Sequence, residues 1–400
     1  MTSPSSSELA AGATLIPVEG RRLRNAFIDL PHRLYAAYPA YVPRLHAQQA
    51  WQHSRKNPWF RHSIAESFLA VRGGRPVGRV TAFLNRSHLG HSGRREALFG
   101  FLDAEEDGAL VSSLLGRVEE RARDWGCDAV VGPVEFSTND TCGLLVDGFE
   151  LPPAILMPWN PPWLPPLVER AGYAPAMSLE AWEIGVRPPV IDEQAGRLRE
   201  RLAARGIGVR PLDMSRFEEE VDRLFPLYEG IYGQNWGFMP LTLEEFREQA
   251  RDLRRATFPD LAFVAEDRGR PIGYAVAVLD ANLVFREFRR GRLLPFNFLK
   301  LPRVRRVGRV RILNLGLVPR YRRLGLDLVL YEAIADACAR HGIPSGEASY
   351  VMGDNEPMRR ALERMGAHVT KRYAIYRKEI GTAATGPEGR GPTLRAEPAP

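Results

Sequence analysis

Cysteine is scarce in this sequence: Cys127, Cys142 and Cys338 are the only three among 400 residues. None of them forms a C-x-x-C pair, and two lie in or next to apolar segments, which predicts buried thiols in a reducing cytoplasm rather than disulfides. Histidine is also infrequent, and its closest pair, His88 and His91, lies in a Gly/Ser-rich loop without other candidate ligands nearby. The sequence therefore predicts no structural or catalytic metal site.

Long hydrophobic runs are absent as well. No apolar stretch approaches the roughly 20 residues that span a bilayer, and residues 1–7 lack the apolar core of a signal peptide. The apolar fraction of 44% and the charged fraction of 26% are ordinary for a globular protein. We therefore expect a cytoplasmic protein whose 400 residues suffice for two or three domains.

Positive charge is concentrated in residues 284–311. This segment has ten Arg or Lys and one acid, Glu287, so its own charge is +9; since the net charge is +7, the remainder carries +7 − 9 = −2. Phenylalanine and leucine are interspersed with the basic residues, a mixture typical of segments that lie at a membrane interface. A nucleic-acid-binding arm would have fewer large apolar residues, so we expect no nucleic-acid partner.

Two interpretations of this segment remain open. Residues 284–301 could make peripheral contact with the inner membrane or a lipid substrate, with Phe285, Phe288 and Phe296 inserted at the interface. The same residues could instead form a surface excursion that packs its own Phe and Leu against the domain. Burial of these phenylalanines would favour the second interpretation.

An internal repeat organises the chain. The pattern of residues 67–83 predicts a hairpin that turns at Gly73-Gly74, and residues 261–278 repeat this pattern nearly residue for residue. The shared Gly-Arg-Pro-Val/Ile-Gly core lies at 74–78 and 269–273. Two copies of one mixed α/β unit are the economical explanation.

The elements that follow each hairpin also match. Each copy continues with a strand, a helix, a second strand and an Asn-led helical segment that ends in Gly. The sequence therefore predicts two tandem domains, at 21–184 and 206–380, joined by a linker at 185–205. Composition predicts disordered tails at 1–20 and 381–400.

The second copy has a turn suited to a phosphate-bearing ligand. The apolar run Ile312–Val318 predicts a strand, and the amphipathic segment Leu326–His341 predicts a helix. The turn between them, Arg322-Arg-Leu-Gly325, would combine backbone N–H groups, the helix dipole and arginine charges at one point. The first copy has four acids at 103–107 instead, which would repel a pyrophosphate. An arginine-rich surface turn without a ligand is the alternative interpretation.

This strand, turn and helix resemble the coenzyme A pyrophosphate loop of the GNAT acyltransferase superfamily, although Asp327 stands where that loop usually has a small residue. Other motifs resemble the bacterial ceramide synthase-like group of this superfamily, in which an aspartate there is ordinary. These motifs are Gly132-Pro-Val-Glu-Phe-Ser-Thr-Asn-Asp-Thr-Cys-Gly143, Met157-Pro-Trp-Asn-Pro-Pro162, Leu30-Pro-His-Arg-Leu-Tyr35, Lys56-Asn-Pro-Trp-Phe60, Gly291-Arg-Leu-Leu-Pro295 and Lys371-Arg-Tyr-Ala-Ile-Tyr376. The resemblance covers about residues 21–380.

The resemblance implies two tandem GNAT-like domains, each a twisted mixed sheet flanked by helices. It also implies an N-acyltransferase that moves an acyl group from a coenzyme A thioester to a long-chain amine or amino alcohol in sphingolipid-like lipid synthesis. Acetyl transfer to a soluble small amine and non-catalytic binding of acyl-CoA or lipid remain open as alternatives. The non-catalytic alternative draws support from Glu363, which stands where the superfamily often has a tyrosine that protonates the leaving thiolate.

The turn at Arg322–Gly325, set against the acidic run at 103–107, leads us to expect coenzyme A in the second copy only. The implied binding residues are Leu317, Val318, Arg322, Arg323, Leu324, Gly325, Leu326, Asp327 and Asn355. In the superfamily a backbone N–H of the strand before the loop donates to the thioester oxygen, which places that donor near Leu317 or Val318. Asn355 is also expected to be an N-cap.

The implied reaction needs a proton acceptor. An alkylammonium group titrates near pH 10, and only the neutral amine attacks a thioester. A carboxylate or a water chain must take the proton, or an apolar pocket must lower the pKa of the amine. The candidate bases are Glu347, Asp354 and, from the first copy, Asp140. Each of them could equally be a cap or a surface acid.

The loop of the first copy, residues 132–163, is dense in Pro, Gly, Trp and polar side chains. Such a composition is typical of a rigid functional loop, and a Pro-rich wrap that seals the two halves together is the alternative. The candidate substrate-binding residues in this loop are Asn139, Asp147, Trp159 and Asn160. We expect Asn139, Asp140 and Asp147 to face the same cavity as the turn at Gly325.

Overall fold

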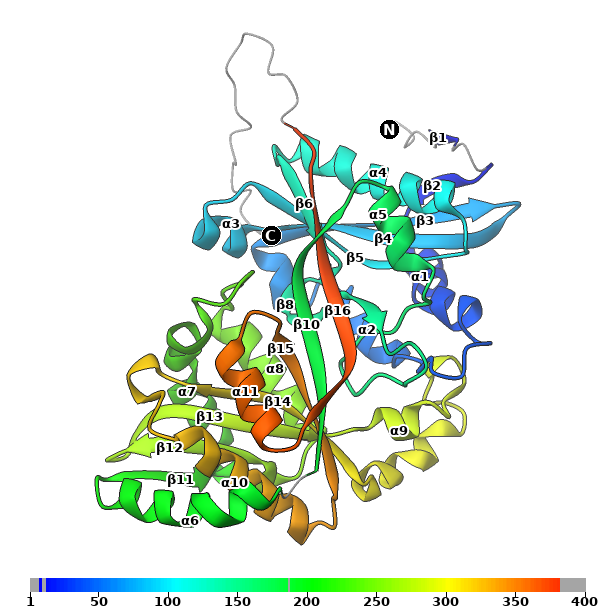
Figure 1. Cartoon of the computed structure of the whole chain (residues 1–400). Coiled ribbons are helices and arrows are strands. Elements are labelled where there is room, and N and C mark those ends of the chain that lie inside the picture. Colours follow the sequence, from blue (N-terminus) through cyan, green and yellow to red (C-terminus); the bar gives the residue numbers. More distant parts are fainter. Residues whose placement is uncertain (1–6, 9–11, 186–187, 382–400) are drawn as a thin grey trace.

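The two copies of the repeat fold as two mixed α/β halves that share one long sheet (Figure 1). The computed structural model describes residues 7–8, 12–185 and 188–381. Nearly all of the predicted tail at 381–400, and most of residues 1–13, lie outside the described residues. The paired α/β halves confirm the predicted fold class.

The N-terminal half contains β1 (Ser7–Glu8), β2 (Thr14–Pro17), α1 (Gly20–Leu34), α2 (His46–Gln52), β3 (Ser63–Arg72), β4 (Arg75–Asn85), α3 (Arg86–Ser92), β5 (Glu96–Ala104), α4 (Gly108–Asp124), β6 (Ala129–Gly132), β7 (Val134–Glu135), β8 (Ser137–Cys142), β9 (Leu144–Asp147), α5 (Leu164–Arg170) and β10 (Ala174–Gly185). The C-terminal half contains α6 (Pro189–Ala203), β11 (Ile207–Pro211), α7 (Phe217–Tyr232), α8 (Leu243–Arg255), β12 (Ala262–Asp267), β13 (Arg270–Leu279), α9 (Asn282–Phe285), β14 (Arg309–Leu317), α10 (Leu326–Arg340), β15 (Ser345–Met352), α11 (Glu356–Arg364) and β16 (His368–Glu379). Short 3-10 turns are η1 (Pro58–Arg61), η2 (Met214–Arg216), η3 (Pro259–Leu261), η4 (Arg289–Gly291), η5 (Asn297–Arg306) and η6 (Pro319–Tyr321).

Each half has the strand pairing that the internal repeat predicts. An antiparallel hairpin, β3–β4 or β12–β13, pairs with a third antiparallel strand, β5 or β14. That strand then pairs in parallel with the strand after the next helix, as β5 does with β6 and β14 with β15. Helices α4 and α10 make these crossovers, because parallel neighbours need a long connection.

The last strand of each half is exchanged at the centre of the sheet. Strand β10 ends the first copy in sequence, yet it pairs with β15 of the second copy on one side and with β16 on the other. Strand β16 in turn pairs with β6 of the first copy. Figure 1 shows β10 and β16 running side by side through the middle of the molecule. Backbone hydrogen bonds therefore join the two halves.

Two segments differ from the sequence expectation. The stretch expected as a linker, 185–205, contains helix α6, whose Ile191, Ala195 and Leu202 are buried at helical spacing in the core of the C-terminal half. Within the tail expected at 1–20, strand β2 pairs with β3 and buries Leu15. In both segments, apolar side chains on one face supply the burial that orders them.

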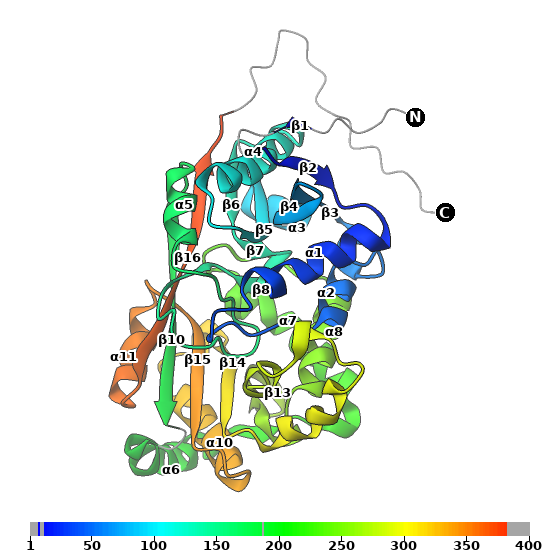
Figure 2. The same ribbon diagram turned by 90° about the vertical axis from the view of Figure 1, so that its right-hand side faces the viewer.

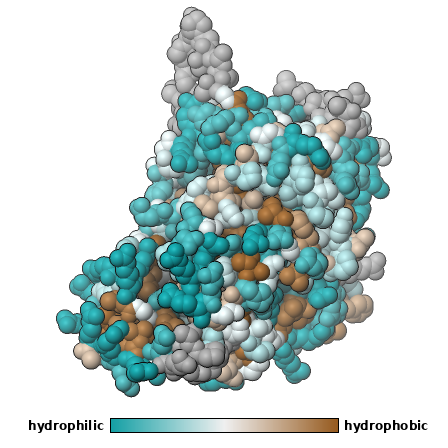
Figure 3. All heavy atoms as spheres, viewed as in Figure 1, coloured by the Kyte–Doolittle hydropathy of each residue, from teal (hydrophilic) through white to brown (hydrophobic). Residues whose placement is uncertain are grey.

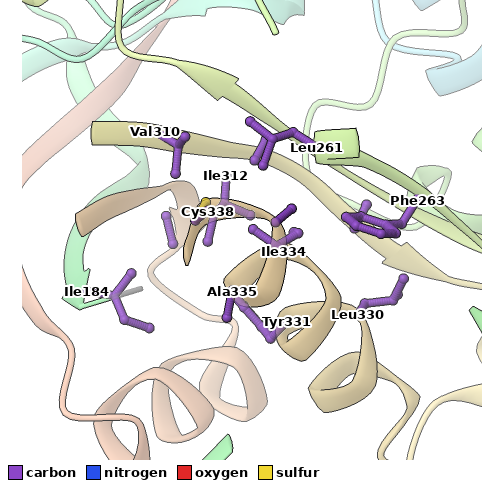
Figure 4. Close-up of a cluster of buried hydrophobic side chains, with 14 of the residues drawn as sticks. Ile184, Leu261, Phe263, Val310, Ile312, Leu330, Tyr331, Ile334, Ala335 and Cys338 are labelled. Carbon is purple, nitrogen blue, oxygen red and sulfur yellow. The ribbon is translucent and has the colours of Figure 1, made fainter. Parts of the chain in front are cut away.

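The core of the C-terminal half lies between α10 and the sheet (Figure 4). Leu330, Ile334 and Cys338 recur every four residues along α10, so they form one face that packs against strand residues such as Ile312 and Val310. This packing holds the start of α10 at the end of β14. Cys127, Cys142 and Cys338 are all buried and unbridged, which confirms the predicted buried thiols.

Candidate active site

The turn before α10 leaves the start of that helix open. Gly325 is its N-cap at φ 76°, and no described side chain caps it. The equivalent helix of the first copy, α4, is capped by Asp107, whose carboxylate accepts hydrogen bonds from Ala109 N at 3.0 Å and Leu110 N at 3.1 Å. The N–H groups of α4 thus already bond a carboxylate, whereas those of α10 are available to an anion.

The arginines around this turn have different roles. Arg322 donates to the carbonyl oxygens of Leu317 at 3.1 Å and Ile231 at 2.8 Å, so it ties the turn to β14 and α7. Arg323 is exposed at φ 70°. Beside the turn lies a hollow of about 580 Å³ whose lining includes Arg205, Arg268, Arg270 and Arg320. Asp267, which accepts from Tyr321 Oη, also lines it, and none of the four arginines makes an ion pair with an acid in the described part of the chain. With four arginines and one acid in its lining, the hollow is electropositive.

Strands β14 and β15 diverge next to this turn. They pair in parallel from Arg309 and Ser345 to Ile312 and Ala348, and beyond these residues they separate into a wedge. Val318 N donates to Ile272 O at 2.9 Å on the β13 side. Because successive residues of a strand present their N–H groups to opposite sides, the N–H of Leu317 faces the wedge. Of the two candidate donors, Leu317 therefore has the suitable direction.

Two of the three candidate bases have surroundings unsuited to that role. Glu347 is fully buried and bonds Lys371 Nζ at 2.8 Å and Arg309 Nη2 at 3.0 Å. Burial alone would raise the pKa of Glu347, but the charges of Lys371 and Arg309 outweigh it and hold the pKa below its ordinary value. Asp354 is exposed at the end of β15, and the neighbouring Asn355 caps α11 by accepting from Met358 N at 3.3 Å.

Asp140 has the surroundings of a proton acceptor. It lies on β8, is half-buried, and accepts a hydrogen bond from Ser137 Oγ at 3.3 Å. Burial of the carboxyl raises its pKa to about 7, and the nearby charge of Glu135 adds to the shift. A carboxyl with this pKa exchanges protons near neutral pH, where a general base is most effective.

The first-copy loop crosses to the C-terminal half near the wedge. Tyr228 Oη donates to Asn139 Oδ1 at 2.6 Å, and Asn139 Nδ2 donates to Met239 O at 3.0 Å. On β15, Tyr350 Oη donates to Cys142 O at 2.8 Å. Asp147 lies apart from these contacts, since its side chain is exposed and pairs with Arg372 at 2.8 Å.

A cavity of about 780 Å³ lies between the halves, next to the wedge. Figure 2 shows α2 of the N-terminal half above α8 of the C-terminal half, and residues of both line the cavity. Its lining residues Ile155 and Met157 touch β14 and β15, since Ile155 O accepts from Arg311 Nη1 at 2.9 Å and Met157 Sδ lies 3.5 Å from Ser349 Oγ.

Trp159 and Asn160 both line this cavity and stabilise the first-copy loop. Asn160 is buried; its Oδ1 accepts from Leu145 N at 2.7 Å, and its Nδ2 donates to Leu145 O at 3.1 Å. The Trp159 indole donates to Phe149 O at 3.0 Å. Asn160 therefore satisfies the loop backbone, and Trp159 supplies an aromatic surface.

The basic, Phe-rich segment divides into a packed part and an exposed part. Phe288 is 1% exposed, so the expectation that it inserts into lipid is wrong, whereas Phe285 is half-buried. They pack against the core of the C-terminal half. The large hydrophobic side chains exposed in the described ranges all lie just after them: Leu294 (73%), Phe296 (72%), Phe298 (44%), Leu299 (65%) and Leu301 (37%). Figure 3 shows hydrophobic patches that interrupt a largely hydrophilic face.

Sequence reasoning missed several residues of this region. Arg311 on β14 lies over the ring of Tyr350 on β15, at 5.4 Å from its centroid, and Lys371 on β16 pairs with Glu347. Tyr232 on α7 lies next to Gly316 on β14, since its Oη would be 2.7 Å from a Cβ at that position. The available signal was a charged residue inside an apolar strand, as at Arg311 and Lys371, because such residues are buried only with partners. Within residues 7–8, 12–185 and 188–381, no His, Cys, Asp or Glu side chains gather as a metal-binding group. No helix in those ranges is long and apolar enough to cross a membrane.

Comparison with known proteins relates this chain to acyltransferases. Residues 221–367 match the acetyltransferase (GNAT) family. The chain is 33% identical to the bacterial ceramide synthase of Caulobacter vibrioides over 379 residues, which covers 92% of this chain and 98% of that protein. It is 31% identical to Protein YghO of Escherichia coli over 362 residues, covering 89% and 92%.

Solved structures share the fold at low sequence identity. A tandem GNAT protein from the clavulanic acid biosynthesis pathway superposes with a TM-score of 0.55 at 13% identity, covering 93% of this chain and 99% of that one. A GCN5-related N-acetyltransferase from Sphaerobacter thermophilus superposes with a TM-score of 0.54 at 18% identity, covering 92% and 96%. The tandem arrangement therefore recurs in other proteins of this fold.

Proposed function

Because the chain belongs to the bacterial ceramide synthase-like group of the GNAT acyltransferase superfamily, we propose that this N-acyltransferase joins a long acyl group from a coenzyme A thioester to the amine of a long-chain amino alcohol. One observation carries the proposal. The wedge between β14 and β15 meets an uncapped helix start at one side and a cavity of about 780 Å³ at the other. The relative in Caulobacter, named a bacterial ceramide synthase, supports the lipid substrate.

Coenzyme A binds the C-terminal half in this proposal. The open first turn of α10, from Arg323 to Asp327, takes the pyrophosphate, and Arg322 holds that turn in place. The electropositive hollow lined by Arg268 and Arg270 suits a further phosphate group. The bound thioester would supply the activated carbonyl, whose oxygen accepts from Leu317 N. Asp107 already occupies the corresponding position on α4.

Two side chains of this chain would move the protons. Asp140 accepts the proton of the amine, directly or through water, since its pKa of about 7 suits a base at neutral pH. Glu363 is exposed on α11, so either another group protonates the thiolate or the thiolate leaves unprotonated. Tyr232, next to Gly316, fits the role of that proton donor because its buried hydroxyl has no hydrogen-bond partner among the described residues and lies beside β14.

The exposed apolar residues support peripheral contact with a membrane. Leu294, Phe296 and Leu299 are each more than half exposed, and Arg290, Arg305 and Arg306 are exposed around them. Anionic headgroups attract such a surface by about 1 kcal/mol per basic residue. In liposome flotation, binding should require anionic lipid and fall with salt, and Phe296→Ser with Leu299→Ser should weaken it without changing Tm. Equal flotation of this variant, or with zwitterionic vesicles, would contradict the contact.

Thiol release tests the reaction. Purified enzyme should release free coenzyme A thiol from a palmitoyl thioester only when a long-chain amino alcohol is present, and mass spectrometry should find the amide. Lipids of a deletion strain should lose the same amide. Efficient turnover of an acetyl thioester with a short soluble amine would instead favour a small-molecule acetyltransferase. Absence of thiol release with every amine tried would favour a non-catalytic lipid-binding protein.

A further inference from the structure

The C-terminal half contributes a largely apolar stretch of the cavity wall, beside which the charged Glu248, Asp252, Arg255 and Arg305 also line the cavity. The apolar stretch is formed mainly by side chains such as Leu253, Leu279, Ala281, Phe285 and Val304. At about 780 Å³ the cavity lies within the range of roughly 300–1,000 Å³ found for small-molecule sites. An unbranched alkyl chain matches a wall of this kind, because it offers no polar group that would need a partner.

The N-terminal half contributes a cluster of buried polar side chains to the cavity wall, among apolar residues such as Phe101 and Ile155. Arg79 pairs with Asp103 at 2.7 Å, and Arg44 pairs with Glu135. Gln49, which is 1% exposed, accepts from Arg79 through Oε1 at 3.3 Å. Asp140 does not line the cavity itself, but it accepts from Ser137 Oγ, and Ser137 pairs with Glu135 between β8 and β7. The polar cluster therefore lies beside the candidate base.

Two atoms of this polar cluster have no hydrogen-bond partner among the described residues. They are Gln49 Nε2, a donor, and Glu135 Oε2, an acceptor, and both are buried. As whole residues, Gln49 is 1% and Glu135 8% exposed, so both are more than nine-tenths buried while lining the cavity. Buried polar atoms are bonded as a rule. A donor and an acceptor left without partners in one cavity indicate a ligand that both accepts and donates hydrogen bonds.

The exposed apolar segment forms part of the same cavity. Leu293, Leu301, Val304 and Arg305 line it, and Leu301 is also 37% exposed to solvent. The residues between them, such as Phe296, project outward. An alkyl chain that enters past Leu301 from a lipid surface would contact the apolar wall first.

We infer that this cavity is the acceptor site, in which the headgroup of a long-chain amino alcohol bonds Gln49 and Glu135 and its tail runs along the apolar wall toward Leu301. The inference rests on the proposed function and specifies its second substrate. An amino alcohol supplies N–H and O–H donors for Glu135 and a hydroxyl oxygen for Gln49. The acyl chain of the donor brings no hydrogen-bond donor to the polar cluster, so it fits the polar residues less well.

Tail length gives a test that needs no variant. The probes are 2-amino-1,3-diols with saturated tails of 10, 12 and 14 carbons, titrated into the full chain below their micelle concentrations without coenzyme A. Affinity should rise about fourfold per methylene, since each buried methylene contributes about 0.8 kcal/mol. A fatty alcohol of equal length should bind at least tenfold more weakly. Affinity independent of tail length would overturn the inference, and so would equal affinity for the fatty alcohol.

Substitutions in the cavity lining test whether the diol probes bind there. Ala256, half-buried at the end of α8, lines the cavity, and Ala256→Trp should weaken the 14-carbon probe at least tenfold while affecting the 10-carbon probe less. Glu135→Gln should weaken all three probes equally, and Gln49→Leu should repeat this result if Glu135→Gln does not fold. Glu119→Gln is the matched control, because Glu119 is a buried acid that pairs with Lys378 on the far side of the N-terminal half. Unchanged binding in Ala256→Trp would overturn the inference.

Thiol release separates this inference from the proposed function. If amine-dependent thiol release persists in Ala256→Trp with the same dependence on tail length, the acyltransferase stands and the cavity assignment fails. The diols could also bind as expected while no amine promotes thiol release in the wild type. In that case the acyltransferase proposal fails. The cavity is then a lipid-binding site, and its assignment as an acceptor site is overturned.

Discussion

Replacing Asp140 by Asn should change activity and stability in opposite directions. Burial raises the pKa of Asp140 to about 7, and the negative charge of Glu135 adds to the shift. If Asp140 accepts the proton of the amine, the charged carboxylate is the active form. Because Asn cannot accept that proton, Asp140→Asn should lower kcat/KM at pH 8 by about 10²–10⁴-fold.

The pH dependence of kcat/KM shows whether the activity lost in Asp140→Asn is that of a general base. The neutral fraction of the amine rises tenfold per pH unit below its own pKa near 10. With Asp140 as base, log kcat/KM of the wild type should climb with a slope of about two below pH 7 and about one between pH 7 and 10. The Asp140→Asn variant should keep a slope of about one throughout, because only the amine still titrates.

The Asp140→Asn substitution should increase the stability of the folded protein. A carboxyl whose pKa rises from 3.8 to about 7 on folding holds its proton more tightly in the folded state, so its contribution to stability is full below pH 3.8 and is lost as pH rises through 7. At 1.36 kcal/mol per pKa unit, charging it costs at most about 4 kcal/mol at pH 8, and its partial exposure lowers that figure. Asp140→Asn should therefore raise Tm at pH 8 and change it little near pH 4.

The assay is thiol release from pH 6 to 9 at constant ionic strength, with thermal unfolding at pH 4 and pH 8. Asp354→Asn is the control, since Asp354 is an exposed acid at the end of β15; it should keep both the wild-type slope and the wild-type Tm. A slope of two that survives in Asp140→Asn, or an undiminished rate at pH 8, would refute Asp140 as the base.

Three further predictions concern other parts of the site. Arg268→Ala with Arg270→Ala should weaken coenzyme A about tenfold in calorimetry and leave dephospho-coenzyme A unaffected if the hollow binds the 3′-phosphate; an equal loss for both would contradict that role. Lys371→Met should lower the free energy of unfolding by about 3–5 kcal/mol, measured in urea, because it leaves the buried Glu347 carboxylate short of a partner. Tyr232→Phe should lower kcat with little change in KM if its hydroxyl protonates the thiolate, and the loss should shrink with a thioester whose thiol is more acidic.

The sequence by itself determined the local elements of this protein. The hairpins at 67–83 and 261–278, the turn at Arg322–Gly325 and the cap at Asn355 are short-range features, whose residues lie within a few positions of one another. Hydrophobic periodicity, turn glycines and capping side chains report such features directly. The resemblance of these motifs to a known group also led to the family of the chain, and the similarity to curated relatives confirmed it.

Only the tertiary structure decided which of the candidate residues share a site. Asn139 and Asp147 lie in one loop, yet Asn139 bonds Tyr228 of the other half and Asp147 is a surface ion pair. Phe288 and Phe296 lie in one basic segment, yet one is 1% and the other 72% exposed. Local sequence describes each side chain, but it does not say which distant surface that side chain will meet.

The exchange of β10 and β16 is the main reason for this difference. It inserts β10 between β15 and β16, so that Glu347 on β15 pairs with Lys371 on β16 across a strand of the other half, and it places the first-copy loop beside the wedge of the second copy. A strand of either half would satisfy the same backbone hydrogen bonds, so the strand pattern is compatible with both arrangements. The partner of each central strand, and with it the cavity between the halves, is set by packing between residues that lie far apart in sequence.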